Sequence, residues 1–339
     1  MKILADISHP AHINFFKNAL GILTAEGHEV FITGLRRGKL PKILEKEMNQ
    51  YPISYVGAHN GSKYSIIVDA NLKKAVNLFN FVRRNSIDIG ISVGSFNLGA
   101  VLKLFGKPNL QFDDDPERPA NVFLEKLTST ALYFPPIVEP KNNVKVMNAL
   151  KEWAYLTPKY FNPSDDVLND YPVEPKQYIF VREVSTGSLN YKGQQANLVA
   201  TIADQFPKNY KVLLSLEDKS TQDQYPEDWI LLQEPISDIH SLIYYSKMVI
   251  SSGDSMAREG AMLGVPSIYC GFREMLANQL LVDRNMLFKT IPDEVPDQMT
   301  KIFDGTIPVQ EQQSFREKLF HEWDDITQFV VSNVKHYAK

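Results

Sequence analysis

Residues 248–271 read MVISSGDSMAREGAMLGVPSIYCG, and this stretch decides the fold. It opens with a short apolar run, which is followed by small polar residues at 251–255 and by a helical pattern from 256 to 263. Gly264 ends that pattern before a second apolar run at 267–270. The order strand, tight turn, helix, strand is the repeating unit of a parallel α/β sheet.

The turn in this stretch is a candidate phosphate-binding site. It consists of Ser252, Gly253, Asp254 and Ser255. In a parallel sheet such a turn lies at the carboxyl end of its strand, where the next helix directs unpaired N–H groups at a ligand. Glu259 lies on the first turns of that helix, within reach of a sugar attached to the phosphate. The alternative is an ordinary turn, with Asp254 or Ser255 as N-cap and Glu259 solvated.

Length and composition indicate two ordinary domains. The chain has 339 residues, and 44% of them are hydrophobic, which is enough for two full-sized cores. A net charge of −4 argues against a general nucleic-acid binder. The single cysteine, Cys270, excludes a disulfide framework and a cysteine-based zinc site.

The N-terminus and the hydropathy pattern predict a cytoplasmic protein. Residues 1–6 read as a strand that reaches an acid at once, unlike a signal peptide. No apolar run approaches the ~20 residues that span a bilayer. We therefore expect no transmembrane segment, while peripheral contact with a membrane surface stays open.

Strand and helix patterns alternate in two blocks. Prolines crowd residues 135–176 between the blocks, with one helix expected at 144–155. The alternation restarts with a strand at 178–181 and a helix at 194–205. Strands that alternate with helices through short turns predict doubly wound parallel sheets.

We expect an α/β protein of two tandem Rossmann-like domains that face a cleft. The first covers residues 1–160, a linker covers 161–176, and the second domain covers 177–310. The terminal helix, 311–339, carries an apolar stripe and is expected to cross back onto the first domain. Ligands should bind outside the carboxyl ends of the strands in each sheet.

Two histidines after the first strand are candidate catalytic residues. His9 and His12 lie at a helix N-terminus, which favours the neutral, proton-accepting imidazole that a general base needs. The alternative is a helix capped by Ser8 with two half-buried histidines. A metal site would need Asp6 as its carboxylate ligand, so we expect no metal here.

The acidic turn DDDPER at 113–118 is the next candidate. Asp114 is the member that we expect to face the cleft, where it could orient an acceptor hydroxyl or a histidine. One of the three aspartates is expected to cap the helix that begins near Pro119. A solvated charge run and a divalent metal site are the alternatives.

The second domain offers two more candidates. Arg182 begins the turn 182–188 and could clamp a diphosphate with paired hydrogen bonds, or else pair with Glu183 at the surface. Asn278 and Gln279 could bind sugar hydroxyls or be surface residues. The chain has no Walker A motif, no GxGxxG after the first strand and no serine nucleophile elbow.

Two motifs carry a family resemblance, SGDSMAREGAMLGVP at 252–266 and DISHPAHINFFK at 6–17. Shorter matches lie at 94–95, 106–108, 112–114 and 152–156. The whole chain resembles the glycosyltransferase-B (GT-B) superfamily, which includes the peptidoglycan N-acetylglucosaminyltransferase and the non-hydrolysing UDP-N-acetylglucosamine 2-epimerase. It is most similar to a family of microbial proteins catalogued as a domain of unknown function with this fold.

The resemblance implies a role for each candidate in the second domain. Glu259 would bind the ribose, and the turn at 252–255 would meet the diphosphate. Arg182 would close over the phosphates, and Asn278 and Gln279 would face the donor sugar. The turn around His9 and His12 would face the acceptor in the first domain.

Asp254 departs from the pattern, because relatives commonly have a second glycine or alanine there. Its charge would repel a diphosphate unless the side chain points away, which favours a different or weaker donor. The paired acids that are characteristic of the epimerase reduce here to Arg258-Glu259, and this weakens the epimerase interpretation.

These observations predict a metal-independent glycosyltransferase that needs no cofactor. It would transfer a sugar from a nucleotide-diphosphate sugar, with UDP as the expected nucleotide, to a carbohydrate or lipid-linked precursor of envelope or surface polysaccharide. His12 or His9, with Asp114, would deprotonate the acceptor hydroxyl, while Arg182 and the helix N-terminus at Ser255 stabilise the departing diphosphate. The alternatives are a sugar-nucleotide 2-epimerase and a non-catalytic nucleotide-sugar-binding protein.

Overall fold

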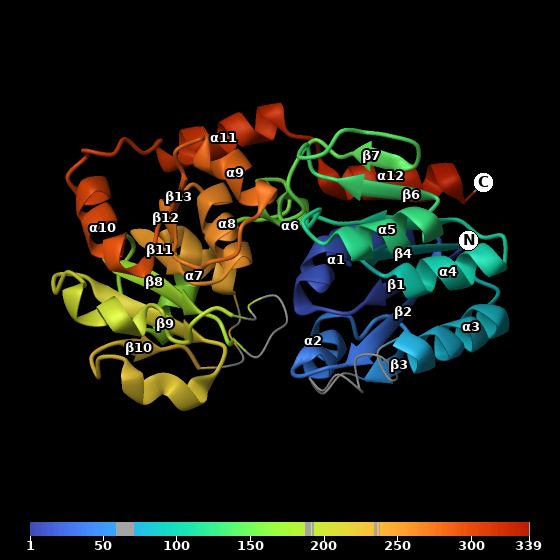
Figure 1. The fold of residues 1–339 in the computed structure, drawn as a ribbon, viewed down its shortest axis with the longest axis horizontal. Helices are drawn as coiled ribbons and strands as arrows, with labels where there is room; N and C mark the ends of the chain where they lie inside the picture. The colour runs from blue at the N-terminus through green and yellow to red at the C-terminus, as the bar shows by residue number, and fades with distance from the viewer. Residues whose placement is uncertain (59–70, 187–190, 192, 234–235, 237, 339) are drawn as a thin grey trace. The chain divides into compact units, whose positions relative to one another are not determined.

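The chain folds into two compact units, each with helices on both faces of a parallel sheet (Figure 1). The computed structural model describes residues 1–58, 71–186, 191, 193–233, 236 and 238–338. One unit comprises residues 1–155 together with 323–339, and the other comprises residues 156–322. The expected pair of doubly wound α/β domains is confirmed.

The described part of the first unit is built on a seven-stranded parallel sheet in the order β3-β2-β1-β4-β5-β6-β7. Its strands are mostly apolar because helices cover both faces. They are β1 (Lys2–Ile7), β2 (Glu29–Arg36), β3 (Ile53–Ala58), β4 (Ile89–Val93), β5 (Asn109–Phe112), β6 (Ala131–Phe134) and β7 (Val144–Val146). The strand order reverses between β1 and β4, where ligands bind in such sheets.

Two helical layers cover this sheet (Figure 1). One layer consists of α1 (Pro10–Ala25), α2 (Leu40–Glu47) and α12 (Ile326–Tyr337), and the other of α3 (Lys74–Asn85), α4 (Phe96–Leu104) and α5 (Pro119–Thr128). Aromatic rings fill the first interface, where Phe15 and Phe16 lie 5.2 and 6.0 Å from Phe112. Leu78 and Leu98 pack in the second.

The described part of the second unit has a six-stranded parallel sheet in the order β10-β9-β8-β11-β12-β13. Its strands are β8 (Tyr178–Glu183), β9 (Lys211–Leu216), β10 (Ile230–Leu231), β11 (Met248–Ser251), β12 (Ser267–Tyr269) and β13 (Leu287–Lys289). The helices are α7 (Ile239–Tyr245), α8 (Asp254–Met262), α9 (Leu276–Val282), α10 (Val295–Phe303) and α11 (Gln312–Glu322), with 3₁₀ turns η2 (Asp165–Asp170), η4 (Ala200–Gln205), η5 (Lys219–Gln224) and η6 (Pro292–Glu294). The strand order reverses between β8 and β11.

The C-terminal segment forms two helices instead of the single helix expected at 311–339. The chain breaks after α11, and Asp325 caps α12 by accepting a hydrogen bond from the Gln328 N–H at 3.0 Å. α12 packs on α1, and the Thr327 hydroxyl donates to the Ala154 carbonyl at 2.8 Å. The last helix is therefore part of the first unit, whereas α11 belongs to the second.

Two other expected helices are wrong, and the expected linker is structured. Residues 144–155 contain the edge strand β7 and the short helix α6 (Trp153–Leu156), because Val144–Val146 pairs with β6. The helix at 194–205 is reduced to η4, since Asn197 adopts a left-handed φ of 55° that interrupts helical geometry. The linker at 161–176 lies inside the second unit and contains η2, whose apolar side chains are buried.

A buried polar network joins four elements of the first unit. Asp6, at the end of β1, accepts hydrogen bonds from Thr33 Oγ1 of β2 at 2.9 Å and from Ser95 Oγ, at the start of α4, at 2.5 Å. Lys74 Nζ of α3 lies 2.6 Å from Asp6 Oδ2 and 3.1 Å from Ser95 Oγ. All four side chains are buried, so the Asp6 and Lys74 charges depend on each other for compensation.

Replacing Lys74 with methionine should lower the free energy of unfolding by about 3–5 kcal/mol, because Asp6 would remain as an uncompensated buried charge. Urea unfolding measures the loss. Lys17→Met is the matched control, because it breaks an exposed ion pair with Glu47 that has the same length, 2.6 Å. This change should lower the free energy of unfolding by less than about 1 kcal/mol. The double variant Asp6→Asn/Lys74→Met should regain most of the stability; a double variant as unstable as Lys74→Met would contradict the pairing.

Candidate functional site

The turn between β11 and α8 packs against the turn that follows β8. Ser252 Oγ accepts a hydrogen bond from the Val184 N–H at 3.0 Å. A Cβ at Gly253 would lie 2.5 Å from Val184 Cγ1, so only glycine fits here. Gly253 is the N-cap of α8 and supplies no side chain to its first N–H groups. These N–H groups, with the half-buried Ser255 on the same turn, form a site suited to an anion.

Asp254 is the first residue of α8, and its carboxylate is held by three side chains. Oδ1 accepts from the Tyr191 hydroxyl at 2.6 Å, and Oδ2 lies 3.2 Å from Arg258 Nη1 and 3.5 Å from Arg273 Nη1. Burial and the Asp254 charge raise the pKa of Tyr191, which stays a hydrogen-bond donor. Two guanidinium groups therefore offset the negative charge of Asp254 beside the helix N-terminus.

Asn278 and Gln279 lie on different faces of α9. Asn278 is buried, and its Oδ1 accepts a hydrogen bond from Arg258 Nη1 at 3.0 Å. Gln279 is exposed, and its Nε2 donates to Asp283 Oδ1 at 2.7 Å. Asn278 thus helps to hold the arginine that pairs with Asp254, while Gln279 is directed to the surface.

Glu259 lies one turn into α8 and is nearly buried. Its Oε1 lies 3.4 Å from His240 Nε2, and His240 belongs to α7. Asp238 fixes the start of α7 by accepting the Ser241 N–H at 3.0 Å, and the ring of Phe161 lies edge-on to His240 at 6.1 Å. The orientation of the Glu259 carboxylate is therefore set from a neighbouring helix.

Arg182 is the penultimate residue of β8 and lies beside the turn at 252–255, because it is paired with Ser251 of β11 in the sheet. Its Nη1 donates to Ser215 Oγ of β9 at 3.0 Å, and its Nη2 lies 3.8 Å from Glu217 Oε2. The acidic partner is thus Glu217 and not Glu183. Residues 187–188, at the end of the expected turn, lie outside the described residues.

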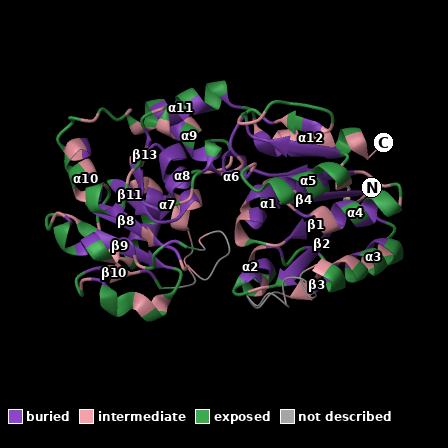
Figure 2. Ribbon diagram, in the orientation of Figure 1, coloured by how far each residue is buried: buried purple, intermediate pink, exposed green. Residues whose placement is uncertain are grey.

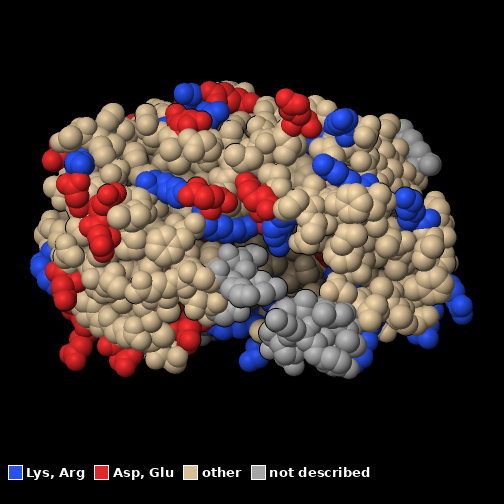
Figure 3. Space-filling model, viewed as in Figure 1, with Lys and Arg blue, Asp and Glu red and all other residues tan. Residues whose placement is uncertain are grey.

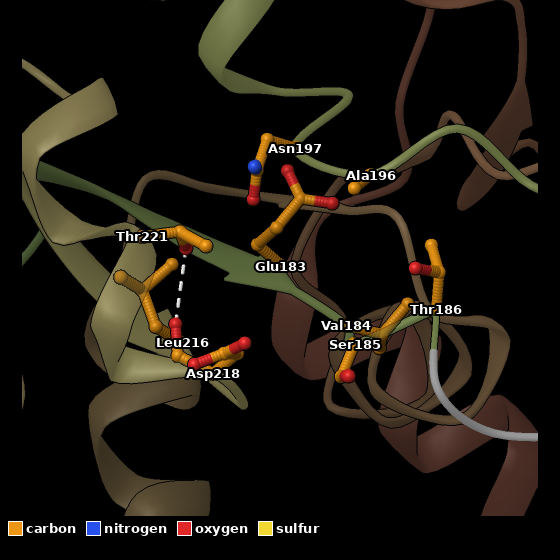
Figure 4. A pocket seen from close by; sticks show the side chains of 9 residues that line it. All are labelled: Glu183, Val184, Ser185, Thr186, Ala196, Asn197, Leu216, Asp218 and Thr221. Carbon is orange, nitrogen blue, oxygen red and sulfur yellow. Dashed lines mark hydrogen bonds between the residues drawn. The ribbon is translucent and has the colours of Figure 1, made fainter.

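Glu183 is buried on the other face of β8. One of its oxygens accepts from the Val199 N–H at 2.8 Å and from the Tyr225 hydroxyl at 3.0 Å, and burial raises its pKa. Figure 4 shows its carboxylate beside Asn197 in a cavity of about 50 Å³. That volume holds a few water molecules and is too small for a nucleotide, so this cavity is not the donor site.

The N-terminus of α1 is capped by His9. Its Nδ1 accepts the Ala11 N–H at 3.3 Å, so the cap is His9 and not Ser8. His12 follows on the same helix with its ring 5.9 Å from that of His9. His12 Nδ1 lies 3.5 Å from the Ser8 N–H, a contact too long to fix the tautomer of the ring.

His12 is neutral at pH 7. Its burial lowers its pKa well below the usual value, and the charges of His9 and Lys151 lower it further, against an opposing effect of Asp114. A neutral imidazole keeps one nitrogen lone pair, which can accept a proton. The electrostatics of the first unit therefore suit His12 to act as a base.

The three aspartates after β5 have different partners. Asp113 Oδ1 accepts from the N–H groups of Asp114 and Asp115 at 2.8 and 3.2 Å. Asp114 Oδ1 lies 2.7 Å from Lys151 Nζ, and Asp115 Oδ2 lies 2.5 Å from Arg118 Nε. The prediction that an aspartate caps α5 is wrong, since Arg118 occupies the N-cap position. Asp113 and Asp115 bind partners within the turn instead.

Beneath this turn, Asp113 approaches the buried Glu125 of α5. Burial and the charge of Asp114 raise the pKa of Asp113 to about 6, and burial and the charge of Asp113 raise that of Glu125 to about 9. Glu125 is therefore protonated at neutral pH, and only one negative charge is carried by the two groups.

The described residues hold no group of three or more histidine, cysteine or acidic side chains suited to a metal ion.

The residues that sequence reasoning missed are cations and hydrogen-bond donors from distant parts of the chain. Lys151 pairs with Asp114, and His240 contacts Glu259. Arg273 and Tyr191 hold Asp254. Arg273 alone carried a usable signal, because a charged residue in the turn after a parallel strand lies at the ligand-binding edge.

Each unit thus has several of its predicted residues at the carboxyl ends of its central strands. In the second unit, Arg182 lies at the end of β8, while the turn at 252–255 and Glu259 follow the neighbouring strand β11. Gln279 is not among them. In the first unit, His9, His12 and Asp114 follow β1 and β5, and the charge of Asp114 acts on His12.

Known proteins that are similar to this chain cover 86–100% of it. A curated relative, the uncharacterized protein MJ0665 of Methanocaldococcus jannaschii, is 21% identical over 308 residues, which are 86% of this chain and 88% of that protein. The glycosyltransferase VinC in complex with DTDP superposes with a TM-score of 0.68 at 13% identity, over 100% of this chain and 99% of that one. The UDP-GlcNAc 2-epimerase from Neisseria meningitidis, bound to UDP-GlcNAc, superposes with a TM-score of 0.66 at 11% identity. The match covers 99% of this chain and 100% of that one.

These structures confirm the glycosyltransferase-B fold that the sequence resemblance implied. A family model described as "Protein of unknown function (DUF354)" matches residues 1–339. The chain is therefore a member of the DUF354 family.

Proposed function

We propose that this protein is a metal-independent glycosyltransferase whose donor is a nucleotide-diphosphate sugar, a UDP-sugar. Its acceptor would be a carbohydrate or lipid-linked precursor of envelope or surface polysaccharide, used in the cytoplasm with peripheral contact to the membrane. The observation that carries the proposal is the start of α8, where a glycine is the N-cap and two arginines pair with Asp254, the first residue of the helix.

The donor would bind at the carboxyl edge of the second sheet. The first N–H groups of α8 and the Ser255 turn would receive the diphosphate, with Arg182 and Arg273 nearby to balance its charge. The side chain of Arg273 is 17% exposed and that of Arg182 is 22% exposed, so part of each arginine is accessible to a ligand. Asp254 would then serve to orient arginines, which removes the objection that it repels phosphate.

Glu259 would bind the ribose hydroxyls of the nucleotide. A carboxylate accepts hydrogen bonds from neighbouring hydroxyl groups, and such charge-assisted bonds are stronger than neutral ones. His240 would keep the carboxylate in the required orientation through its 3.4 Å contact. Binding of the ribose therefore depends on both α7 and α8.

The acceptor would bind on the first unit, with His12 as the base. His12 would take the proton of the acceptor hydroxyl while the acceptor oxygen bonds to the anomeric carbon of the donor sugar. The bond from that carbon to the diphosphate breaks, and the leaving group departs with the bonding electrons. Asp114, held by Lys151, would stabilise the imidazolium that forms, with His9 as the neighbouring ring.

Nucleotide binding tests the donor site. A UDP-sugar at 100 times its Kd should stabilise the protein by about 2.7 kcal/mol in thermal unfolding. Glu259→Gln should weaken UDP binding at least about tenfold, because charged hydrogen bonds to the ribose are lost. His240→Phe, which keeps an aromatic ring against Phe161, should weaken it by a smaller factor.

Calorimetry with a 2′,3′-dideoxy nucleotide supplies the control for the ribose. Neither Glu259→Gln nor His240→Phe should change the affinity for that analogue, since it lacks the hydroxyls. Glu274→Gln makes the same chemical change at an exposed carboxylate and should leave all affinities unchanged. Absence of stabilisation by any nucleotide would end the proposal.

The pH dependence of His12 tests the base. Lys151→Met removes a charge that lowers the pKa of His12, so this pKa should rise; Asp114→Asn removes a charge that raises it, so the pKa should fall. NMR titration of the His12 C2 proton measures both shifts without an acceptor. Shifts in the same direction would contradict the assigned electrostatics.

The reaction itself is separated from its alternatives by product analysis. A sugar nucleotide incubated alone should stay intact, and it should be consumed when the acceptor is added. His12→Gln should lower that turnover by roughly 10²–10⁴-fold with little change in nucleotide affinity. Formation of an epimer without acceptor would identify an epimerase, and binding without any turnover would identify a non-catalytic nucleotide-sugar-binding protein.

A further inference from the structure

The outer face of the first unit exposes large apolar side chains on three adjacent helices, α3, α4 and α5. We call this surface the α3–α5 face. The exposed fractions reach 61% at Val76, 76% at Leu104 and 60% at Phe123. Phe79, Leu124 and Leu127 on the same helices are exposed as well. Since the opposite faces of α3 and α5 pack in the core, these two helices are apolar on two sides, which is unusual for a surface helix, and Leu104 adds an exposed apolar residue at the end of α4.

The charge on this face has one sign. Arg83, Arg84, Lys103 and Lys126 are exposed, and Glu125, the one acid in the three helical segments, is 1% exposed. This occurs in a chain whose net charge is −4. In Figure 3 the surface over these helices is neutral with basic side chains around it and without acidic ones.

The three helices form one continuous layer. The ring of Phe79 in α3 lies 5.0 Å from that of Phe105, which follows α4. Lys103 Nζ of α4 donates to the Leu127 carbonyl of α5 at 2.8 Å. Figure 2 shows exposed positions along the outer side of all three helices. The apolar and basic side chains therefore belong to a single surface.

We propose that the α3–α5 face binds the surface of an anionic phospholipid bilayer. The apolar side chains would enter the boundary between headgroups and acyl chains, and the four cations would contact lipid phosphates. The charge favours a bilayer over a second copy of this chain, because two identical cationic faces repel each other. None of the helices in the described ranges is long and apolar enough to cross a membrane, so the contact would be interfacial.

This inference rests on the proposed function in one respect, because that function includes peripheral contact with a membrane, and the inference names the surface that makes the contact. It adds that α3–α5 would be the surface turned toward the bilayer. The donor site of the second unit plays no part in it, and a lipid-linked acceptor is not required for the binding itself.

Co-sedimentation with vesicles tests the proposal on the full chain. Vesicles of phosphatidylglycerol and phosphatidylcholine should bind the protein, and pure phosphatidylcholine vesicles should bind it much more weakly. Added salt should weaken binding to the anionic vesicles. Phe123→Ser/Leu127→Ser should lower the partition coefficient at least about tenfold. Arg84→Gln/Lys126→Gln should lower it by roughly fivefold per charge.

Matched changes on the second unit provide the controls. Phe320→Ser and Lys318→Gln alter an exposed apolar and an exposed basic residue of α11 and should leave vesicle binding unchanged. Near-ultraviolet circular dichroism checks that each variant is folded. Unchanged binding by the α3–α5 variants, equal losses in the control variants, or no binding to anionic vesicles would overturn the proposal.

Two further readouts separate this proposal from its rivals. Sedimentation velocity detects a dimer that Phe123→Ser/Leu127→Ser disperses, and such a dimer without vesicle binding would assign the face to a second copy and overturn the proposal. Thermal shifts with UDP should be the same in the α3–α5 variants as in the natural protein. Vesicle binding by a protein that binds no nucleotide would refute the proposed function and support the membrane surface.

Discussion

The carboxylate of Asp254 between two guanidinium groups is the interaction on which the proposed donor site depends. Arg258 is fully buried, so its charge would be very costly without this partner. Asp254 also engages Arg273 and Tyr191, which come from segments on either side of α8 in the sequence. One side chain thus organises the start of α8, and the turn in front of it can remain without a capping side chain.

The first unit uses the same principle with different residues. Lys74 is paired with Asp6, and Lys151 is paired with Asp114, so each of these lysines has an acidic partner. His12 is left as the neutral group among these pairs. A base has to be unprotonated before it reacts, and burial among compensated charges provides that state at neutral pH.

The sequence predicted the sheets well and the partners of the site residues poorly. The turn at 252–255 and Glu259 were found because strand, turn and helix follow one another along the chain. His240, Arg273 and Lys151 contact these sites from other elements, and no local pattern records such pairings. Asn278 is the clearest example, because the sequence pattern of a polar residue on a helix is the same whether its side chain faces a ligand or a buried arginine.

The errors in secondary structure have a related origin. The segment 144–155 has helical spacing, but its first residues complete the edge of the sheet by pairing with β6, and this long-range pairing overrides local propensity. The Val199 N–H donates to the Glu183 carboxylate and not to a helical carbonyl, and Asn197, two residues earlier, has a left-handed backbone conformation. The periodicity of apolar residues cannot predict either feature. In both places a partner from another element decides the structure: the backbone of β6 in the first and the Glu183 carboxylate in the second. The same holds for the site, where the chemistry of Asp254 is set by arginines and a tyrosine and not by its own position at a helix N-terminus.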